Sequence, residues 1–299
     1  MRTLEQAARE HGLSAETALD TKATRVLVIS RNAGSMSADV ESKLRTAFAD
    51  HLVLDFDPDE DISPLLSSQA RIVVAGGDGT VEFFVRKFAD SKHPIGIISL
   101  GTYNNLAHAL SLPMELDRAI EVARSGQPRS ITLGRVNGRI FVEACAIGLF
   151  GEAIALGESA KDLEFGKLAP KLKDVIGARR FQYELAGDID GSGSAMSLVF
   201  SNTASIGSQL AIADGSPTDP FLEFSVHAGR TRTDIVGRVI AGAVLGRHAE
   251  DGTAQVFRFK RLEVKTKPRV RVYADNFLVG RTPATITAET SALKVLLPN

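Results

Sequence analysis

The stretch Arg71-Ile-Val-Val-Ala-Gly-Gly-Asp-Gly-Thr80 joins a short apolar segment directly to a turn rich in glycine. Ile72–Ala75 are predicted to form a buried strand, and Val81–Phe88 the helix that follows it. The three glycines of Gly76–Thr80 lack Cβ atoms, so backbone N–H groups can approach an anion, and the helix adds its positive N-terminal end. Asp78 would repel a phosphate unless a metal ion or a reacting hydroxyl lay between them. The stretch therefore predicts a phosphate site, with a plain tight turn as the alternative.

Apolar strands alternate with helical patterns through the first part of the chain. Strands are predicted at 25–30, 51–56, 72–75 and 94–100, and helices at 38–50, 81–88 and 106–110. This alternation is typical of an open parallel α/β sheet, in which ligands bind beyond the carboxyl ends of the strands. The turns at 31–35, 76–80 and 101–105 are therefore expected to converge on one crevice.

From about residue 130 the sequence changes to many short segments with period-two alternation. This pattern predicts an antiparallel β-rich domain, interrupted by helical stretches at 151–176 and 233–245. Its predicted strands cover 130–136, 139–146, 180–186, 195–201, 222–227, 254–259, 261–265, 269–274 and 292–296. The expected organisation is an extension over 1–24, an α/β domain over 25–128 and a β-rich domain over 129–299, whose last residues return to the first domain.

The composition is that of an ordinary globular protein, with 299 residues of which 44% are hydrophobic and 24% charged. The formal net charge of −1 provides no overall positive field for nucleic acid. Residues 223–281, however, hold 12 Lys and Arg against 6 Asp and Glu. This local excess suits an anionic membrane surface or a phosphorylated ligand, and a solvated sheet face is the alternative. The oligomeric state stays open.

Cys145 is the single cysteine and lies in the apolar run 141–149, which excludes an internal disulfide and indicates a core position. The most apolar window, 235–245, is shorter than the ~18 residues of a membrane span and contains Arg238. The first residues lack the apolar centre of a signal peptide. These features predict a cytoplasmic protein whose contact with a membrane would be peripheral.

Several motifs occur in a fixed order along the chain: Gly76-Gly-Asp-Gly-Thr80, the loop within 94–107, Val136-Asn-Gly-Arg-Ile-Phe141 with Ile147-Gly-Leu-Phe150, Gly246-Arg-His248, and Gly280-Arg-Thr-Pro283 with Ala292-Leu-Lys-Val295. In this order they resemble the diacylglycerol kinase catalytic-domain family, which includes soluble bacterial lipid kinases and sphingosine kinases. NAD kinases and 6-phosphofructokinases are similar at a greater distance. The resemblance spans nearly the whole chain after residue 24. It implies a nucleotide-binding α/β domain followed by a β-rich substrate-side domain.

The resemblance also implies a chemistry and a set of site residues. The family transfers the γ-phosphate of ATP to a lipid hydroxyl with Mg²⁺, and a carboxylate takes the hydroxyl proton. By this resemblance the nucleotide would contact Gly76, Gly77, Asp78, Gly79, Thr80, Gly101, Thr102, Asn104 and Asn105. Asp78 and Asp275 are the predicted catalytic carboxylates, and Asp219 is the predicted metal ligand. The expected partners are ATP, a diacylglycerol- or sphingoid-like lipid and an anionic membrane surface, with no nucleic acid.

Several carboxylates of the family pattern are replaced in this chain. Asn105 stands where the family has an aspartate, and an amide binds Mg²⁺ poorly. The family's Asp-Gly-Glu, whose Glu is the general base, aligns with Asp275-Asn276-Phe277, so Asp275 is the nearest replacement base. Loss of a general base typically lowers the rate on the order of 10²–10⁴-fold. Further departures are Ser30-Arg31 for Asn-Pro, Glu82-Phe83 for Asn-Glu, and Thr218-Asp219-Pro220 for Asp-Asp-Gly.

Two classes of function follow from this combination. The first is an ATP-dependent lipid kinase that uses the glycine turn for the nucleotide phosphates. The second is a degenerate relative that binds nucleotide or lipid without turnover, and Asn105 together with Phe277 motivates it. NAD kinase-like activity is a third alternative, which the order of the C-terminal motifs favours less than the lipid kinase.

Overall fold

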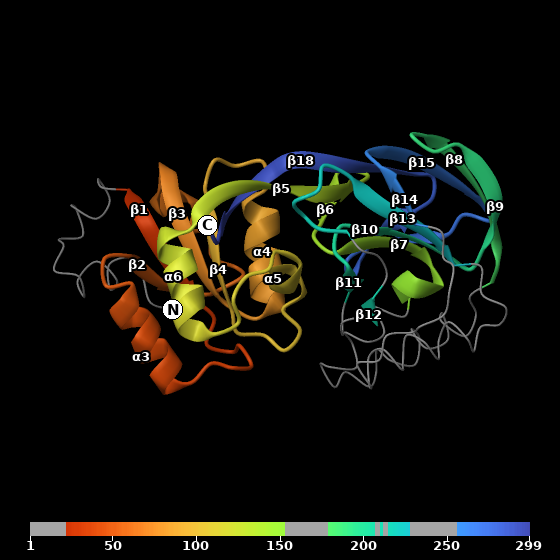
Figure 1. Cartoon of the computed structure of the whole chain (residues 1–299). Coiled ribbons are helices and arrows are strands. Elements are labelled where there is room, and N and C mark those ends of the chain that lie inside the picture. The colour runs from red at the N-terminus through yellow and green to blue at the C-terminus, as the bar shows by residue number, and fades with distance from the viewer. Residues whose placement is uncertain (1–21, 153–178, 207–209, 212–214, 228–255) are drawn as a thin grey trace. The chain divides into compact units, whose positions relative to one another are not determined.

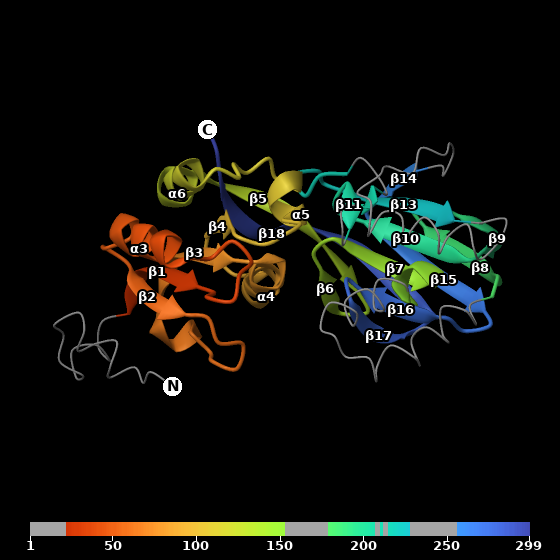
Figure 2. The same ribbon diagram turned by 90° about the horizontal axis from the view of Figure 1, so that it is seen from below.

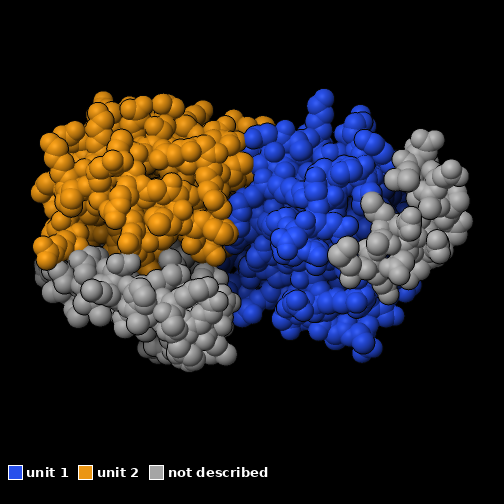
Figure 3. Space-filling model, turned by 180° about the vertical axis from the view of Figure 1, so that it is seen from behind, with its two compact units in different colours: residues 1–131, 292–299 blue, residues 132–291 orange. Residues whose placement is uncertain are grey.

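The computed structural model of the chain describes residues 22–152, 179–206, 210–211, 215–227 and 256–299 (Figure 1). Most of the predicted extension 1–24 and of the helical stretch 151–176 lies outside these residues, as do the stretch 233–245 and the Gly246-Arg-His248 motif. The chain divides into two compact units (Figure 3). Unit 1 comprises Met1–Ile131 and Ala292–Asn299, and unit 2 comprises Thr132–Ser291.

Unit 1 is an open parallel α/β sheet, as predicted. Its strands lie in the order β2 (Leu52–Asp55), β1 (Ala23–Ile29), β3 (Leu66–Gly76) and β4 (Ile95–Ser99), all parallel. The end of β18 (Ala284–Leu297) runs parallel to β4, with Val295 opposite Ile95. The helical elements described in this unit are α3 (Ala38–Ala47), η1 (Ser63–Leu65), α4 (Asp78–Phe88), α5 (Asn105–Ala109) and α6 (Leu116–Ser125).

Helices cover both faces of the sheet in unit 1. Leu27, Ile29 and Val73 share a core cluster with residues of α3 and α6, whereas α4 lies on the other side of the strands (Figure 2). The strands are therefore buried on both faces, which explains why 26–29 and 72–75 are continuous apolar runs. Helix α6, whose buried residues are Ala119, Ile120 and Ala123, is absent from the sequence-based prediction.

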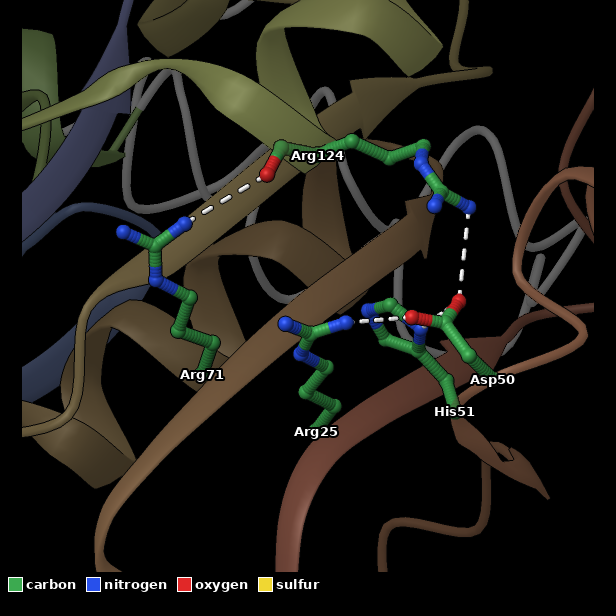
Figure 4. A network of polar contacts seen from close by, with 5 residues as sticks. All are labelled: Arg25, Asp50, His51, Arg71 and Arg124. Carbon is green, nitrogen blue, oxygen red and sulfur yellow. Dashed lines mark hydrogen bonds and ion pairs between the residues drawn. The ribbon is translucent and has the colours of Figure 1, made fainter.

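A polar network lies at the amino ends of the strands in unit 1 (Figure 4). Arg25 on β1 is opposite Arg71 on β3. Asp50 forms ion pairs with Arg25 and with Arg124, whose Nη1 is 3.4 Å from Oδ1, and His51 Nδ1 lies 3.0 Å from the same oxygen. Arg71 donates a hydrogen bond of 3.4 Å to the carbonyl oxygen of Arg124, at the end of α6. One carboxylate thereby offsets the repulsion between neighbouring guanidinium groups.

Unit 2 is built from antiparallel β-strands, as predicted. One sheet continues from β18 through β15 (Arg261–Lys267), β8 (Phe181–Gly187) and β9 (Gly191–Ala195), with β5 (Gln127–Val136) on β18 and β6 (Arg139–Phe141) on β5. The second sheet has the order β14 (Val256–Phe259), β13 (Leu222–His227), β10 (Ser197–Ser201), β7 (Ala144–Gly148), β16 (Arg271–Ala274) and β17 (Phe277–Arg281). Strands β11 (Ser205–Ile206) and β12 (Leu210–Ala211) form a separate pair.

The described residues of unit 2 include a core cluster of buried side chains, among them Phe141, Phe200 and Leu262. Cys145 belongs to this cluster, and burial raises the pKa of its thiol, so it is a core residue as predicted. The single strand predicted over 139–146 is wrong, because the chain divides there into β6 and β7. Where the chain divides, the backbone N–H groups of Val142, Glu143 and Ala144 donate to the carboxylate of Asp275.

Candidate functional site

The glycine turn joins the end of β3 to the start of α4. Gly77 is the residue before α4, and no side chain caps the helix. A Cβ atom on Gly76 would lie 2.9 Å from the Thr80 side chain and 3.1 Å from that of Ser30, so packing alone requires glycine there. A Cβ atom on Gly79 would meet no atom within 4 Å. Gly79 therefore leaves open space in front of the backbone, which is what the close approach of a phosphate needs.

Asp78 links the glycine turn to the loop at 101–105. Its Oδ2 accepts the backbone N–H of Tyr103 and its Oδ1 that of Asn105, both at 3.3 Å. Asn104 accepts the N–H of Gly101 at 3.0 Å and donates to the carbonyl oxygen of Gly101 at 3.1 Å. A Cβ atom on Gly101 would lie 2.6 Å from Asp78 Oδ2, so glycine is required there too. The side chain of Asp78 thus holds the two loops together, and that of Asn104 closes the loop at 101–105 on itself.

Backbone hydrogen bonds bring the three predicted turns side by side. The N–H of Ser35 donates to the carbonyl oxygen of Leu100 at 3.0 Å, and the N–H of Leu100 donates to that of Gly76 at 2.8 Å. Ser30, just before the first turn, donates to the carbonyl oxygen of Ala75 at 2.9 Å. The turns at 31–35, 76–80 and 101–105 therefore lie side by side, as expected, and their convergence on one crevice stays a prediction.

A cavity of about 610 Å³ opens beside the glycine turn. Its walls come from the end of β1 and the following turn, from the segment after β2, and from the glycine turn itself: Ile29, Ser30, Arg31, Asn32, Ala33, Asp55, Phe56, Pro58, Gly77, Gly79 and Thr80. Among these described residues Arg31 is the only cation and Asp55 the only carboxylate. In the sequence Arg31 stands out only as a departure from the family pattern. Its place beside the glycine turn follows from the pairing of β1 with β3.

Asp275, the predicted replacement base, lies in the turn between β16 and β17 of unit 2 with a left-handed backbone (φ 50°). Its carboxylate accepts the backbone N–H groups of Val142 (3.0 Å), Glu143 (2.9 Å) and Ala144 (3.2 Å). Val142 and Glu143 lie between β6 and β7, and Ala144 is the first residue of β7. The geometry is that of an anchor for the turn, and a proton transfer to Asp275 would compete with these bonds.

Phe277, which occupies the aligned base position, lies at the start of β17. Its side chain is 40% exposed, and the guanidinium group of Arg139 lies 4.5 Å from the ring centroid. Such a distance is typical of a cation–π contact. Phe277 therefore offers an exposed apolar surface beside a positive charge, and no proton acceptor.

Asp219, the predicted metal ligand, lies in a turn of unit 2. Its Oδ2 accepts the N–H of Ser216 at 3.2 Å, and its backbone oxygen accepts the hydroxyl of Thr132 at 2.5 Å. Within the described ranges, no three His, Cys, Asp or Glu side chains group closely enough to hold a metal ion. In unit 1 the family's second carboxylate is replaced by Asn105, which is only 3% exposed, while Thr102 is exposed. A metal role for Asp219 stays a prediction.

Glu152 forms a polar cluster that the sequence did not indicate. Tyr273 donates to Glu152 Oε2 at 2.6 Å, and Arg271 Nη1 lies 3.3 Å from both carboxylate oxygens. Burial, followed by the hydrogen bond to Glu152, raises the pKa of Tyr273, so its hydroxyl remains a donor at neutral pH. The cluster links the segment after β7 to β16. Its partners are about 120 residues apart in sequence, which is why spacing alone does not reveal it.

Comparison with known families gives two matches in the order of the two units. Residues 25–136 match the diacylglycerol kinase catalytic domain, and residues 159–297 match the YegS C-terminal NAD kinase beta sandwich-like domain. A diacylglycerol kinase of Bacillus subtilis (strain 168) is 27% identical over 236 residues, covering 76% of this chain and 77% of the relative. A lipid kinase-like protein of Staphylococcus haemolyticus is 30% identical over 241 residues, covering 77% of both.

Solved structures with the same fold include both kinds of kinase. The crystal structure of a diacylglycerol kinase from Bacillus anthracis matches with a TM-score of 0.68 at 20% identity, covering 93% of this chain and 98% of the other. Yeast NADH kinase complexed with NADH matches with a TM-score of 0.51 at 11% identity, covering 94% and 85%. At these identities the likeness concerns the fold, and it agrees with the α/β sheet followed by a β-rich unit.

Proposed function

Because the chain belongs to the diacylglycerol kinase catalytic-domain family, we propose that it transfers the γ-phosphate of ATP to the hydroxyl group of a diacylglycerol- or sphingoid-like lipid. The observation that carries this proposal is the cavity beside the glycine turn, where Gly79 leaves open space in front of the backbone. In phosphoryl transfer the protein mainly positions the reactants and stabilises charge. A preformed space for the phosphates is the first requirement of that chemistry.

The residues at the glycine turn fit a magnesium ion carried by the nucleotide. Such an ion is bound through one or two carboxylates together with the substrate phosphates. Asp78 would supply the carboxylate, because each of its oxygens accepts a backbone hydrogen bond of 3.3 Å and a carboxylate has further acceptor capacity. When bound, the ion would neutralise charge on the phosphates. With or without it, Asp78 holds the loop at 103–105 against the turn.

Phosphate transfer also requires a base that removes the proton of the lipid hydroxyl, and neither Phe277 nor Asp275 is well suited to this role. Phe277 cannot accept a proton, and the oxygens of Asp275 accept three backbone N–H groups. We assign Asp275 the role of a structural anchor for the turn between β6 and β7. The same two observations support a second candidate function, a relative that binds the nucleotide without turnover.

A lipid acceptor requires contact with a membrane surface, and we propose the start of β17 for this contact. Phe277 and Leu278 are 40% and 55% exposed. Arg139 lies beside the Phe277 ring, and Arg281 on β17 is exposed. Exposed apolar side chains flanked by arginines suit a bilayer with anionic headgroups. Among the residues that the structure describes, no helix has the length and apolar character needed to cross a bilayer.

Nucleotide binding and phosphate transfer are measured separately to test the proposal. The full chain is titrated with ATP in the presence and absence of Mg²⁺, and is then incubated with γ-labelled ATP and diacylglycerol, sphingosine, total lipid extract or NAD. The lipid kinase predicts a labelled lipid. Binding without any labelled product supports the second candidate, and labelled product from NAD alone supports NAD kinase-like activity. A folded chain that neither binds ATP nor transfers phosphate contradicts both the kinase and the nucleotide-binding relative.

A further inference from the structure

Arg31 is the cation of the cavity beside the glycine turn, and it is held at the rim by two carboxylates. Its Nη2 donates to Glu41 Oε1 at 3.0 Å and lies 3.3 Å from Asp55 Oδ1. The Arg31 side chain is 50% exposed, and that of Asp55 39%. Exposed ion pairs of this kind contribute little free energy, because water and salt screen them. The Arg31 guanidinium can therefore exchange these partners for another anion at low cost.

Arg45 on α3 binds the same two carboxylates. Its Nη2 lies 2.9 Å from Glu41 Oε1 and 3.5 Å from Asp55 Oδ1, and Arg45 is not among the residues that line the cavity. Burial raises the pKa of Glu41, but the hydrogen bonds and charges of Arg45 and Arg31 outweigh it and lower the pKa below its ordinary value. Glu41 and Asp55 therefore both keep Arg45 as a cationic partner when Arg31 moves away.

A nucleotide triphosphate would bring several negative charges into a cavity whose described lining contains one cation. Gly77 and Gly79 can offer backbone N–H groups, and these carry no net charge. A guanidinium group binds phosphate oxygens in a bidentate manner through charge-assisted hydrogen bonds, and a triphosphate carries more negative charge than a carboxylate. Arg31 is thus the side chain in the lining whose electrostatic attraction to the ligand increases with the number of phosphates.

We propose that Arg31 binds the nucleotide phosphates in this cavity, and that Glu41 and Asp55 hold it at the rim until the phosphates replace them as its partners. The inference rests on the proposed function, in that a nucleotide occupies the cavity. It adds a specificity determinant. Arg31 makes the affinity depend on the number of phosphates, so that ATP is favoured over ADP, and ADP over AMP and adenosine.

The test compares Arg31→Gln with Arg45→Gln, because both variants remove one arginine from the same pair of carboxylates. Each full chain is titrated by calorimetry with ATP, ADP, AMP, adenosine and inorganic tripolyphosphate, with Mg²⁺ and with EDTA. Arg31→Gln is expected to weaken ATP and tripolyphosphate binding about 10- to 100-fold, the value of a charge-assisted contact, and to change adenosine binding less than about threefold. Arg45→Gln is expected to keep ATP affinity within about threefold of the wild type.

The outcomes separate this inference from the proposed function. Equal ATP affinity in the wild type and Arg31→Gln overturns the role of Arg31 while the nucleotide site stands. An equal loss in both variants also overturns it, since the shared carboxylate network would then be responsible. If the wild type binds tripolyphosphate through Arg31 but binds no nucleotide, Arg31 is a phosphate ligand, and both the nucleotide site and its selectivity for ATP are refuted. If the wild type binds neither nucleotide nor tripolyphosphate, both the role of Arg31 and the nucleotide site are refuted.

Discussion

Replacing Asp275 with glycine removes the carboxylate that accepts the N–H groups of Val142, Glu143 and Ala144. Glycine adopts the observed φ of 50° without strain, so the substitution removes the carboxylate with little backbone cost. The three donors belong to residues that are 0%, 8% and 3% exposed. A buried N–H group left without an acceptor costs about 1–3 kcal/mol. Because Asp275 is only partly buried and water can replace part of the loss, we expect the free energy of unfolding to fall by about 2–4 kcal/mol.

Urea unfolding followed by circular dichroism measures this change in the full chain. In Asp275→Asn the asparagine can adopt the left-handed backbone and keeps one acceptor oxygen. We therefore expect the free energy of unfolding to fall by an intermediate amount, about 1–2 kcal/mol. Asn276→Gly, at the next and exposed position of the same turn, is the matched control and is expected to change stability by less than about 1 kcal/mol. If Asp275→Gly keeps the wild-type stability but abolishes phosphate transfer, Asp275 is a base and the anchoring role is refuted.

Gly79→Ala is expected to keep the melting temperature and to weaken ATP binding, because the added Cβ meets no protein atom but enters the cavity. Calorimetry that finds equal ATP affinity for Gly79→Ala and the wild type contradicts the phosphate site. Gly101→Ala is expected to lower the free energy of unfolding by about 1–3 kcal/mol, because its Cβ clashes with Asp78. Burial raises the pKa of Asp50, but hydrogen bonds from its neighbours outweigh this effect and hold the pKa well below its ordinary value. The ionised Asp50 therefore stabilises the fold at neutral pH, and this contribution is lost as the pH falls below about 4. Melting curves at pH 7 and pH 3 are expected to show a smaller acid-induced loss for Asp50→Asn than for the wild type, and equal losses refute this. Phe277→Ser combined with Leu278→Ser is expected to reduce sedimentation with vesicles that contain anionic lipid; unchanged sedimentation rules out this contact surface.

The glycine turn and the side-by-side position of the three loops could be predicted because local rules determine them. A buried strand, glycines without Cβ atoms and a following helix are all contained in Arg71–Phe88. The α/β topology then places the carboxyl ends of parallel strands at one edge of the sheet. These rules concern neighbours in sequence or along a repeated pattern, so they can be applied to the sequence alone.

The partners of Asp275 and the position of Arg31 could not be predicted in this way. The donors to Asp275 are 131 to 133 residues away in sequence. Alignment with the family identifies Asp275 as a carboxylate near the lost base, but it carries no information on what its oxygens bind. Arg31 enters the cavity through the register of β1 against β3 and the position of α3. Such long-range contacts depend on the packing of the whole unit, which no local pattern specifies.

Lipid kinase activity is tested most directly by transfer of labelled γ-phosphate from ATP to diacylglycerol in mixed micelles with Mg²⁺. The wild-type chain and Gly79→Ala are compared at equal concentration, after melting curves have shown that both are folded. We expect labelled lipid from the wild type and a reduced yield from Gly79→Ala at limiting ATP. A folded wild-type chain that yields no labelled lipid with this acceptor or with a total lipid extract contradicts the lipid kinase.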